Sequence, residues 1–392
     1  MSNSTPSINH TSIASTNEIK PFRINIPQAD LDDLQYRLSH TRWPDTLPDA
    51  GWTYGVSLTY VKELVAYWKN EYDWRKNETR LNGIPQFTTT IDGANVHFFH
   101  VRSAEPDALP LILTHGWPGS IVEFLELIGP LTDPRAHGGD PADAFHVVIP
   151  SVPGFGFSGP PRDNGWNTPR IAKAWAELMK RLGYEYYGAH GGDVGSLVSR
   201  EMGIQKPEGL LGVHVLQLFS FPSGDPAEMV DLSTDDQKRL QVLANFHERA
   251  GYNAIQQTRP LTLSYGLADS PAGQLAWNAE LFNGFGDGVD AVNRDAFLTN
   301  VMLYWLTNTA ESSARWYYED AHTKDKAAPK LNTTPTGVAV FAYDFQSMKR
   351  FAERDNTNIV QWSEFERGSH FAAMDAPDLL TIDLRNFFRR FR

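Results

Sequence analysis

From residue 109 onward the chain alternates short apolar runs with stretches of helical periodicity, and this alternation restricts the fold more than any other feature. Several runs are apolar at nearly every position, as strands buried on both faces of a sheet must be. Strands that alternate with helices in this way form a mostly parallel sheet flanked by helices. The predicted strands are Leu109–Leu113, His146–Pro150, Tyr184–His190, Leu210–Phe219, Gly337–Ala342 and Asn358–Phe365.

The third predicted strand leads into Gly191-Gly192-Asp193-Val194-Gly195, and a helix is predicted over residues 196–202. A Gly-x-nucleophile-x-Gly turn between strand and helix is typical of the α/β-hydrolase fold, where it projects one side chain from the sheet. Here that side chain is a carboxylate, which is already ionised at neutral pH. It can attack an sp³ carbon, as in an epoxide or a haloalkane, and form an alkyl ester. The alternative is a loop aspartate that caps the next helix.

Residues 18–108 form an extension ahead of the alternating region and predict two helices and a hairpin. Leucines at helical spacing predict a first helix that Pro44 ends. A second helical pattern runs from Leu58 to about Leu81. Two β-rich runs flank Asp92–Asn95 and predict a hairpin. Residues 1–17, which are rich in Ser, Thr and Asn, predict a disordered tail that is not a signal peptide.

Between residues 221 and 320 the alternation lapses into helical patterns, prolines and a glycine-rich segment at 283–288. An insertion between two strands at the carboxyl edge of the sheet would form a mainly helical lid over Asp193. We therefore predict an α/β-hydrolase core in two parts, residues 109–220 and 321–392. The lid occupies residues 221–320, and the N-terminal extension wraps this core.

Composition narrows the classes of partner and cofactor. The net charge of −12 argues against a nucleic-acid partner, which would favour a basic surface. The chain has no cysteine, so disulfides, thiolate metal sites and a cysteine nucleophile are excluded. No apolar run approaches the roughly 20 residues of a membrane span. We expect a cytoplasmic protein that needs no metal or organic cofactor, and a homodimer is left open.

The loop after the first buried strand offers hydrogen-bond donors for catalysis. It reads His115-Gly116-Trp117-Pro118-Gly119-Ser120. In α/β-hydrolases a backbone N–H from this loop and another from the residue after the nucleophile form the oxyanion hole. Those donors are predicted to be Trp117 and Val194. His115 is expected to be a structural hydrogen-bonding residue of the loop rather than a catalytic one.

A base and its acid are predicted near the C-terminus. His370 follows a Gly-Ser turn, and the order nucleophile, acid, histidine is that of the α/β-hydrolase fold. Asp344 follows the buried strand 337–342 and lies 26 positions before His370, with one further strand between them. That spacing suits two adjacent parallel strands. Glu366 and Asp320 are rival acids, but neither ends a buried strand.

An epoxide oxygen also needs a proton donor as its bond to carbon breaks. A tyrosine stays protonated at neutral pH and can hydrogen-bond the ring oxygen and then protonate it. The lid segment contains several candidates, which sequence chemistry alone does not rank: Tyr252, Tyr265, Tyr304, Tyr317 and Tyr318.

From about residue 20 to 390, the chain resembles the microsomal-type epoxide hydrolases, which include soluble fungal and bacterial members and insect juvenile-hormone epoxide hydrolases. The most specific run is Gly-Tyr-Asn-Ala-Ile-Gln-Gln-Thr-Arg-Pro-Leu-Thr-Leu at residues 251–263. Other matching motifs are Thr41-Arg42-Trp43-Pro44, the loop at 115–120, the loop at 150–158, the turn at 191–195 and the segment 266–273.

The resemblance implies roles for individual residues. Tyr252 and Tyr317 match the family's paired tyrosines, with Tyr318 as the alternative if the local helix is shifted. Asp344 and His370 match its acid and histidine. The implied activity converts an apolar epoxide and water to a vicinal diol through an aspartyl ester. The membrane anchor of mammalian members is not carried over.

Three other functions remain to be weighed. A haloalkane dehalogenase shares the fold and the aspartate, but commonly has tryptophan where this chain has Val194. A non-catalytic carrier of apolar epoxides or hormones would require a degraded catalytic position. A serine-type esterase is disfavoured because Ser196 lies off the turn.

Overall fold

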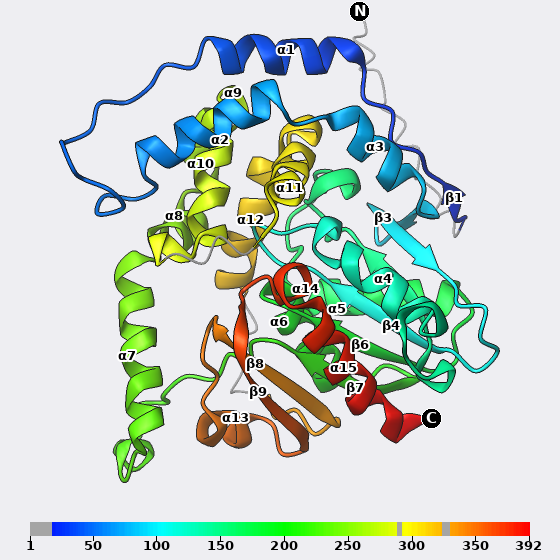
Figure 1. The fold of residues 1–392 in the computed structure, drawn as a ribbon. Helices are drawn as coiled ribbons and strands as arrows, with labels where there is room; N and C mark the ends of the chain where they lie inside the picture. Colours follow the sequence, from blue (N-terminus) through cyan, green and yellow to red (C-terminus); the bar gives the residue numbers. More distant parts are fainter. Residues whose placement is uncertain (1–17, 288–291, 324–329) are drawn as a thin grey trace, which may run out of the picture.

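The computed structural model describes residues 18–287, 292–323 and 330–392, so the predicted tail at 1–17 lies outside the described residues. A nine-stranded sheet runs through the molecule in the order β1-β2-β3-β5-β4-β6-β7-β8-β9 (Figure 1). Its strands are β1 Lys20–Pro21, β2 Gln86–Ile91, β3 Ala94–Val101, β4 Leu109–Thr114, β5 Phe145–Pro150, β6 Tyr187–Gly191, β7 Leu210–Val215, β8 Thr336–Tyr343 and β9 Ile359–Ser369.

The six predicted core strands are all present and form the parallel part of the sheet. The pairs from β5 through β4, β6, β7 and β8 to β9 are parallel, whereas β1, β2 and β3 join at one edge in antiparallel pairs. Two strands are shorter than predicted. β6 begins at Tyr187 because residues 184–186 still form the connection from the preceding helix, and β7 ends at Val215.

Alternating side chains of β4 enter two separate cores. In β4, Leu111 and Leu113 pack with α4 (Leu125–Thr132) and α15 (Pro377–Phe388) on one face. Ile112, between them, packs on the other face with α5 (Thr168–Arg181) and α6 (Val194–Gln205). This two-residue period fixes which face each side chain takes. The helices therefore cover both faces and leave the carboxyl edge of the sheet for the loops.

The N-terminal extension contains three helices rather than the predicted two. They are α1 (Gln28–Ser39), α2 (Leu58–Asn70) and α3 (Trp74–Asn82). The prediction of a single helix over 58–81 was wrong. Asp73 accepts a hydrogen bond from the backbone N–H of Lys76 and begins a new helix. The first helix ends at Ser39, before Pro44, and the Thr41 hydroxyl donates to carbonyls of its last turn.

The hairpin of β2 and β3 has a shorter turn than the four residues expected. Asp92 and Gly93 alone connect the strands, with φ of 48° and 79°. Positive φ at both central residues gives a turn whose twist matches that of paired strands, and Asp-Gly is a favoured pair for it.

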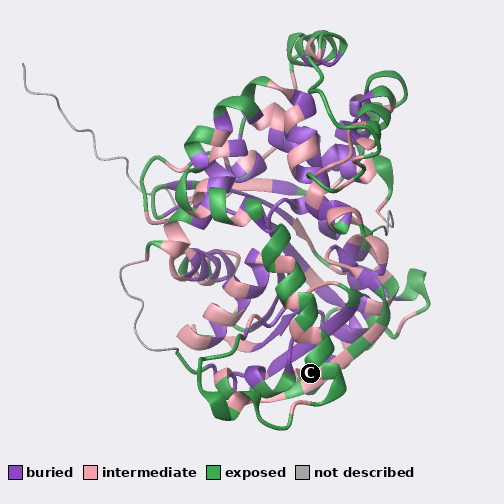
Figure 2. Cartoon of the chain, turned by 90° about the vertical axis from the view of Figure 1, so that its left-hand side faces the viewer, coloured by how far each residue is buried: buried purple, intermediate pink, exposed green. Residues whose placement is uncertain are grey.

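The chain between β7 and β8 forms a helical insertion over the carboxyl edge of the sheet, with α1 and α2 outside it (Figure 1). Its helices are α7 (Thr234–Arg249), α8 (Gly251–Thr258), α9 (Pro260–Asp269), α10 (Pro271–Phe282), α11 (Arg294–Thr307) and α12 (Ala310–Ala321). Buried residues concentrate in the sheet and in the helices that lie against it (Figure 2). α7 projects from this body and buries no residue.

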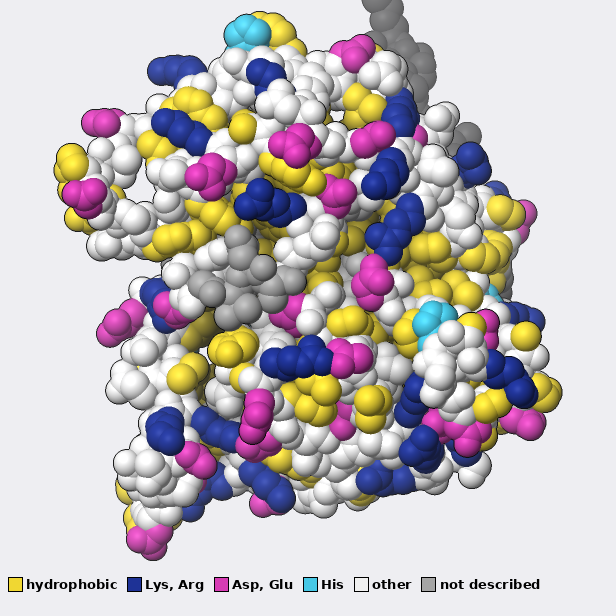
Figure 3. Space-filling model, in the orientation of Figure 1, with side chains coloured by type: hydrophobic (Ala, Val, Ile, Leu, Met, Phe, Trp, Pro, Cys, Tyr) yellow, Lys and Arg dark blue, Asp and Glu magenta, His cyan; other side chains and the backbone are white. Residues whose placement is uncertain are grey.

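The surface carries mixed charge. On the face of the described residues shown in Figure 3, acidic and basic side chains are interspersed rather than gathered by sign. Among the helices of the described residues, none combines the length and the apolar character needed to cross a bilayer.

Candidate active site

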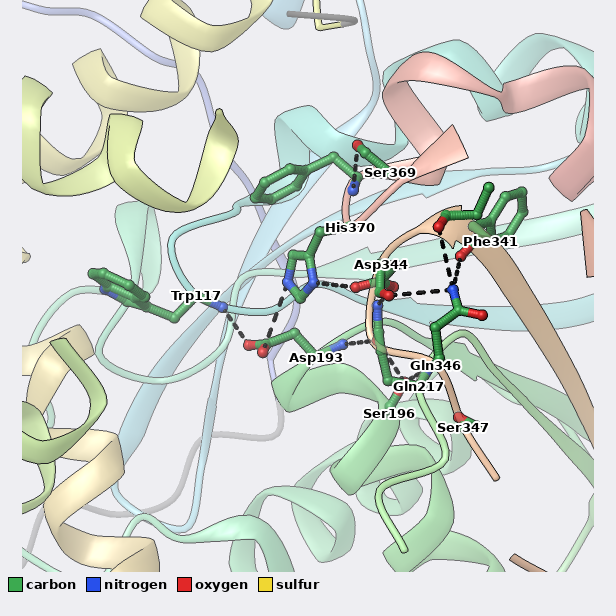
Figure 4. A network of polar contacts seen from close by, with 12 residues as sticks. Trp117, Asp193, Ser196, Gln217, Phe341, Asp344, Gln346, Ser347, Ser369 and His370 are labelled. Carbon is green, nitrogen blue, oxygen red and sulfur yellow. Dashed lines mark hydrogen bonds and ion pairs between the residues drawn. The ribbon is translucent and has the colours of Figure 1, made fainter. Parts of the chain in front are cut away.

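Four loops at the carboxyl edge of the sheet bring the predicted core site residues together (Figure 4). These are Trp117 after β4, Asp193 after β6, Asp344 after β8 and His370 after β9. Parallel strands present their carboxyl ends at one edge, so residues far apart in the chain meet there. The helical insertion adds Tyr252 from α8 and Tyr317 from α12.

Asp193 lies at a sharp corner between β6 and α6. Its backbone has φ 53° and ψ −119°, a conformation that side-chain-bearing residues rarely adopt. Neighbouring backbone passes so close that a Cβ on Gly195 would lie 1.8 Å from the carbonyl oxygen of Thr114. A Cβ on Gly116 would lie 2.5 Å from Asp193 Oδ1. The glycines of both loops are therefore required for the aspartate to project as it does.

Both predicted oxyanion donors lie at the carboxylate of Asp193. The backbone N–H of Trp117 donates to Asp193 Oδ1 at 2.9 Å, and the backbone N–H of Val194 also hydrogen-bonds this carboxylate. Burial raises the pKa of Asp193, whereas the charge of His370 and these two hydrogen bonds lower it. The donors and the histidine thus offset the cost of burying the carboxylate.

His370 lies between two carboxylates. Its Nδ1 is 2.8 Å from Asp344 Oδ1, and its Nε2 is 3.8 Å from Asp193 Oδ2. Nε2 has no hydrogen-bond partner among the residues that the structure describes. Burial lowers the pKa of His370, but the charge and hydrogen bond of Asp344, with further contributions from Asp193 and Glu123, raise it to about 9. When the neutral ring carries its proton on Nδ1, Nε2 is the unprotonated nitrogen that can serve as a base beside Asp193.

The rival acids do not hold the histidine. Asp320 accepts a hydrogen bond from the backbone N–H of Thr168 at the start of α5, and Glu366 is exposed on β9. Asp344, with a side chain that is 3% exposed, is the acid that contacts His370.

Two tyrosines from the insertion lie beside Trp117. The ring of Tyr252 stacks on that of Trp117 with centroids 5.0 Å apart, and Tyr317 meets both rings edge to face. A side-chain hydrogen bond joins the two tyrosines. Burial and the charge of Asp193 raise the pKa of both phenols, so both stay protonated at neutral pH.

The other candidate tyrosines lie elsewhere. Tyr317 is 8% exposed, whereas Tyr318 is 39% exposed and stacks on His322 at the outside of α12. Tyr265 is largely exposed on α9. Tyr304 is buried, and its hydroxyl donates to the carbonyl of Gly119.

Family models match two successive parts of the chain. The model "Epoxide hydrolase N terminus" matches residues 19–124, and the model "alpha/beta hydrolase fold" matches residues 110–265.

Relatives match over nearly the whole chain. A Stigmatella aurantiaca protein named "Putative epoxide hydrolase" is 48% identical over 95% of this chain and 86% of its own length. "Epoxide hydrolase 1" of Sus scrofa is 33% identical over 95% of this chain and 89% of its own. The crystal structure of juvenile hormone epoxide hydrolase from the silkworm Bombyx mori superposes with a TM-score of 0.86 at 29% identity, covering 96% of each chain.

The chain belongs to the epoxide hydrolase family. It has the α/β-hydrolase fold, and its activity is the hydrolysis of epoxides. The fold class and the family expected from the sequence are thereby confirmed, and the dehalogenase and carrier alternatives lose their support.

Two polar residues at the site of this epoxide hydrolase were missed by sequence reasoning. Glu123, in the short helix η1 (Ile121–Phe124), is 4% exposed, and burial raises its pKa to about 8. Gln217, just after β7, is 1% exposed. Gln217 is a lone polar residue within an apolar run at the carboxyl end of a strand, and that pattern was the available signal, whereas Glu123 shares its run with Glu126.

His115 is a buried hydrogen-bonding residue of its loop in the epoxide hydrolase, as the sequence predicted. Its ring is buried, with Nδ1 3.0 Å from the carbonyl oxygen of Gly116. Its Nε2 accepts a hydrogen bond from the backbone N–H of Val152. Among the described residues, no group of three or more His, Asp or Glu side chains is arranged to hold a metal ion.

Proposed function

We propose that this enzyme converts an apolar epoxide and water to a vicinal diol through a covalent ester on Asp193. One observation carries the proposal. Asp193 Oδ1 accepts a hydrogen bond from the backbone N–H of Trp117, and Asp193 Oδ2 faces His370 Nε2. Two buried tyrosines, Tyr252 and Tyr317, belong to the same packed cluster as Trp117.

In the first step, Asp193 Oδ2 attacks a carbon of the epoxide. A bond forms between Oδ2 and carbon while the bond from that carbon to the ring oxygen breaks. Tyr252 and Tyr317 hydrogen-bond the ring oxygen, and one of them transfers its proton to it as the bond breaks. Oδ1, which already accepts a hydrogen bond from the backbone N–H of Trp117, becomes the carbonyl oxygen of the ester.

In the second step, His370 Nε2 takes a proton from water, and the oxygen of that water attacks the ester carbon. Negative charge then develops on Oδ1, where the N–H groups of Trp117 and Val194 stabilise it. Each such donor contributes about 3 kcal/mol. The bond between the ester carbon and Oδ2 breaks, the imidazolium gives its proton to Oδ2, and the diol leaves with Oδ2. The proton left on the new Asp193 carboxyl returns to the tyrosine that protonated the ring oxygen, so that both groups are restored.

Ester formation also prepares the histidine for this step. The negative charge of Asp193 is one cause of the raised pKa of His370. An ester at Asp193 carries no charge, so that contribution disappears once the epoxide has reacted, and the negative charge passes to the tyrosine that gave its proton, which lies against Trp117. The pKa of His370 falls, and the neutral imidazole that the second step requires becomes more populated.

The helices over residues 221–320 support the predicted role of a lid. They carry Tyr252 and Tyr317 and lie over the carboxyl edge of the sheet, where Phe285 stacks on Tyr252 and adds to the aromatic surroundings. Such surroundings favour an apolar substrate. The expected homodimer and cytoplasmic location stay predictions, as do the boundaries of the lid and the N-terminal extension.

A single turnover in water labelled with heavy oxygen tests the ester. With styrene oxide and enzyme in excess, the label is expected in the peptide that contains Asp193, and the diol of that turnover is expected to be unlabelled. In His370→Gln the ester should accumulate and add the mass of the epoxide to the same peptide. Label in the first-turnover diol would overturn the proposal.

A further inference from the structure

Gln217 connects the nucleophile to the acid that orients the histidine. Its Oε1 accepts a hydrogen bond of 2.5 Å from the backbone N–H of Asp193, and its Nε2 donates to Asp344 Oδ2 (Figure 4). These partners follow two different strands, β6 and β8, and Gln217 follows β7 between them. One buried side chain thus spans the site beneath His370.

The chemistry of the two partners requires an amide at this position. A backbone N–H needs an acceptor, and a carboxylate oxygen needs a donor. A glutamine side chain supplies both at once, whereas a carboxylate supplies only acceptors and an apolar side chain supplies neither. The same reasoning fixes which atom of the amide is oxygen and which is nitrogen.

Gln217 is itself held in place by the nucleophile turn. Its backbone N–H donates to the Ser196 hydroxyl oxygen at 3.3 Å, and Ser196 Oγ lies 3.2 Å from Gln217 Oε1. The Ser196 hydroxyl also lies 2.8 Å from the carbonyl oxygen of Gly191. Ser196, the serine that was disfavoured as a nucleophile, therefore helps to anchor the amide.

Both ends of this connection bear on the geometry of catalysis. At one end, the amide satisfies an N–H group of Asp193, whose backbone is strained at positive φ. At the other end, Asp344 has Oδ1 on His370 and Oδ2 on Gln217, so both carboxylate oxygens are held. The plane of the carboxylate fixes the imidazole that places Nε2 3.8 Å from Asp193.

We propose that Gln217 is a positioning residue that aligns His370 with the Asp193 ester, and that its main effect is on ester hydrolysis. The inference rests on the proposed function. Ester formation needs only Asp193 and the tyrosines. Hydrolysis also needs His370, oriented by Asp344, to be aligned with the carbonyl of the ester.

The test is a rapid-quench single turnover of Gln217→Met with styrene oxide, in which peptide mass spectrometry follows the ester. A misplacement of reacting groups by about 1 Å can cost about 100-fold in rate. We expect ester decay to slow about 100-fold and ester formation to slow less than about tenfold, so that the ester accumulates.

The pH dependence of ester decay gives a second readout. Without the amide, an oxygen of Asp344 loses its donor and attracts the imidazolium more strongly, so the ionisation of His370 should shift to higher pH. Asp193 and Glu123 also face His370, but they are unchanged in the variant. A purely structural role would lower the amount of folded enzyme and leave this ionisation in place.

Gln86→Met is the matched control. Gln86 is also a buried glutamine whose amide is hydrogen-bonded at both ends, because its Oε1 lies 3.0 Å from His97 Nε2 and its Nε2 donates to the carbonyl of Leu81 at 3.0 Å. It lies on β2, in the antiparallel part of the sheet. The control should lose stability without any change in the ratio of ester formation to ester decay.

Gln217→Asn serves if the methionine variant does not fold, because it keeps the amide but is one methylene too short to span both partners. The role of Gln217 would be overturned if ester formation and ester decay slowed equally in the variant used. It would also be overturned if the ionisation of His370 did not shift. Absence of the ester in His370→Gln would overturn the proposed function instead, so the two failures are distinguishable.

Discussion

The hydroxyl of Tyr304 donates a hydrogen bond of 2.7 Å to the backbone carbonyl of Gly119. One turn earlier on α11, Asn300 Nδ2 donates to the carbonyl of Pro118 at 2.6 Å. Both side chains are buried. A helix of the insertion thus holds the loop whose Trp117 N–H contacts Asp193, so this helix would help to support the proposed oxyanion hole.

Tyr304→Phe should lower both stability and turnover. The carbonyl of Gly119 would lose its buried donor, which costs about 1–3 kcal/mol in the free energy of unfolding. Because the loop is then less firmly held, we expect kcat to fall about tenfold, the equivalent of about 1.4 kcal/mol. Urea unfolding and steady-state kinetics measure the two effects.

Tyr72→Phe is the control for this prediction. The Tyr72 hydroxyl lies 2.9 Å from Thr299 Oγ1 on the same helix α11, but Tyr72 belongs to the N-terminal extension. This variant should lose stability and keep its kcat. If Tyr304→Phe keeps the wild-type kcat, the hydrogen bond from Tyr304 to Gly119 has no part in positioning the loop.

The two adjacent tyrosines of α12 should differ sharply. Tyr317 lies against Tyr252 and Trp117, whereas Tyr318 is on the outside of the helix. Loss of a general acid typically costs 100-fold or more, so Tyr317→Phe should slow ester formation about 100-fold. Tyr318→Phe should leave it unchanged. Single-turnover ester formation decides between them, and the reverse result would assign the role to Tyr318.

Turnover should depend on pH through His370. Its pKa is about 9 in the free enzyme, but the neutral imidazole is the form that accepts a proton from water. Ester formation removes the charge of Asp193, so the ionisation that governs ester decay should lie below 9. We expect kcat, where hydrolysis limits it, to rise with pH and level off before pH 9. A flat profile of kcat from pH 6 to 9 would argue against His370 as the base.

The parallel core was predictable because burial on both faces leaves a continuous apolar run for each strand. The run from Leu109 to Leu113 shows this, since β4 differs from it by a single residue. Breaks that depend on a single hydrogen bond were not predictable. The helix expected over 58–81 is divided because Asp73 caps a new helix, and periodicity continues across such a break.

The site residues that were foreseen are those that a motif or the chain order marks, such as Asp193 and His370. Gln217 and Glu123 meet the site through neighbours that are remote in sequence. Gln217 reaches Asp344 over 127 positions, a relationship that only the adjacency of β7 and β8 creates. Lone polar residues in apolar runs at strand ends are therefore worth singling out in similar chains.

Glu123 should make the stability of the enzyme fall as pH rises. Burial raises its pKa to about 8, whereas an unfolded glutamate titrates at about 4.3. Between these values the folded protein holds a proton that the unfolded chain has lost. Unfolding therefore becomes easier by about 1.4 kcal/mol for each pH unit in this interval. Glu123→Gln removes this group from the titration.

Urea unfolding at pH 5, 6, 7 and 8 compares Glu123→Gln with the wild type. His370 titrates in both proteins, so its own effect on stability largely cancels in the difference. The free energy of unfolding of the variant should rise relative to that of the wild type with each step up in pH. At pH 8 the variant should be the more stable protein. A stability difference that stays constant from pH 5 to 8 would show that the carboxyl of Glu123 does not hold its proton in the folded enzyme.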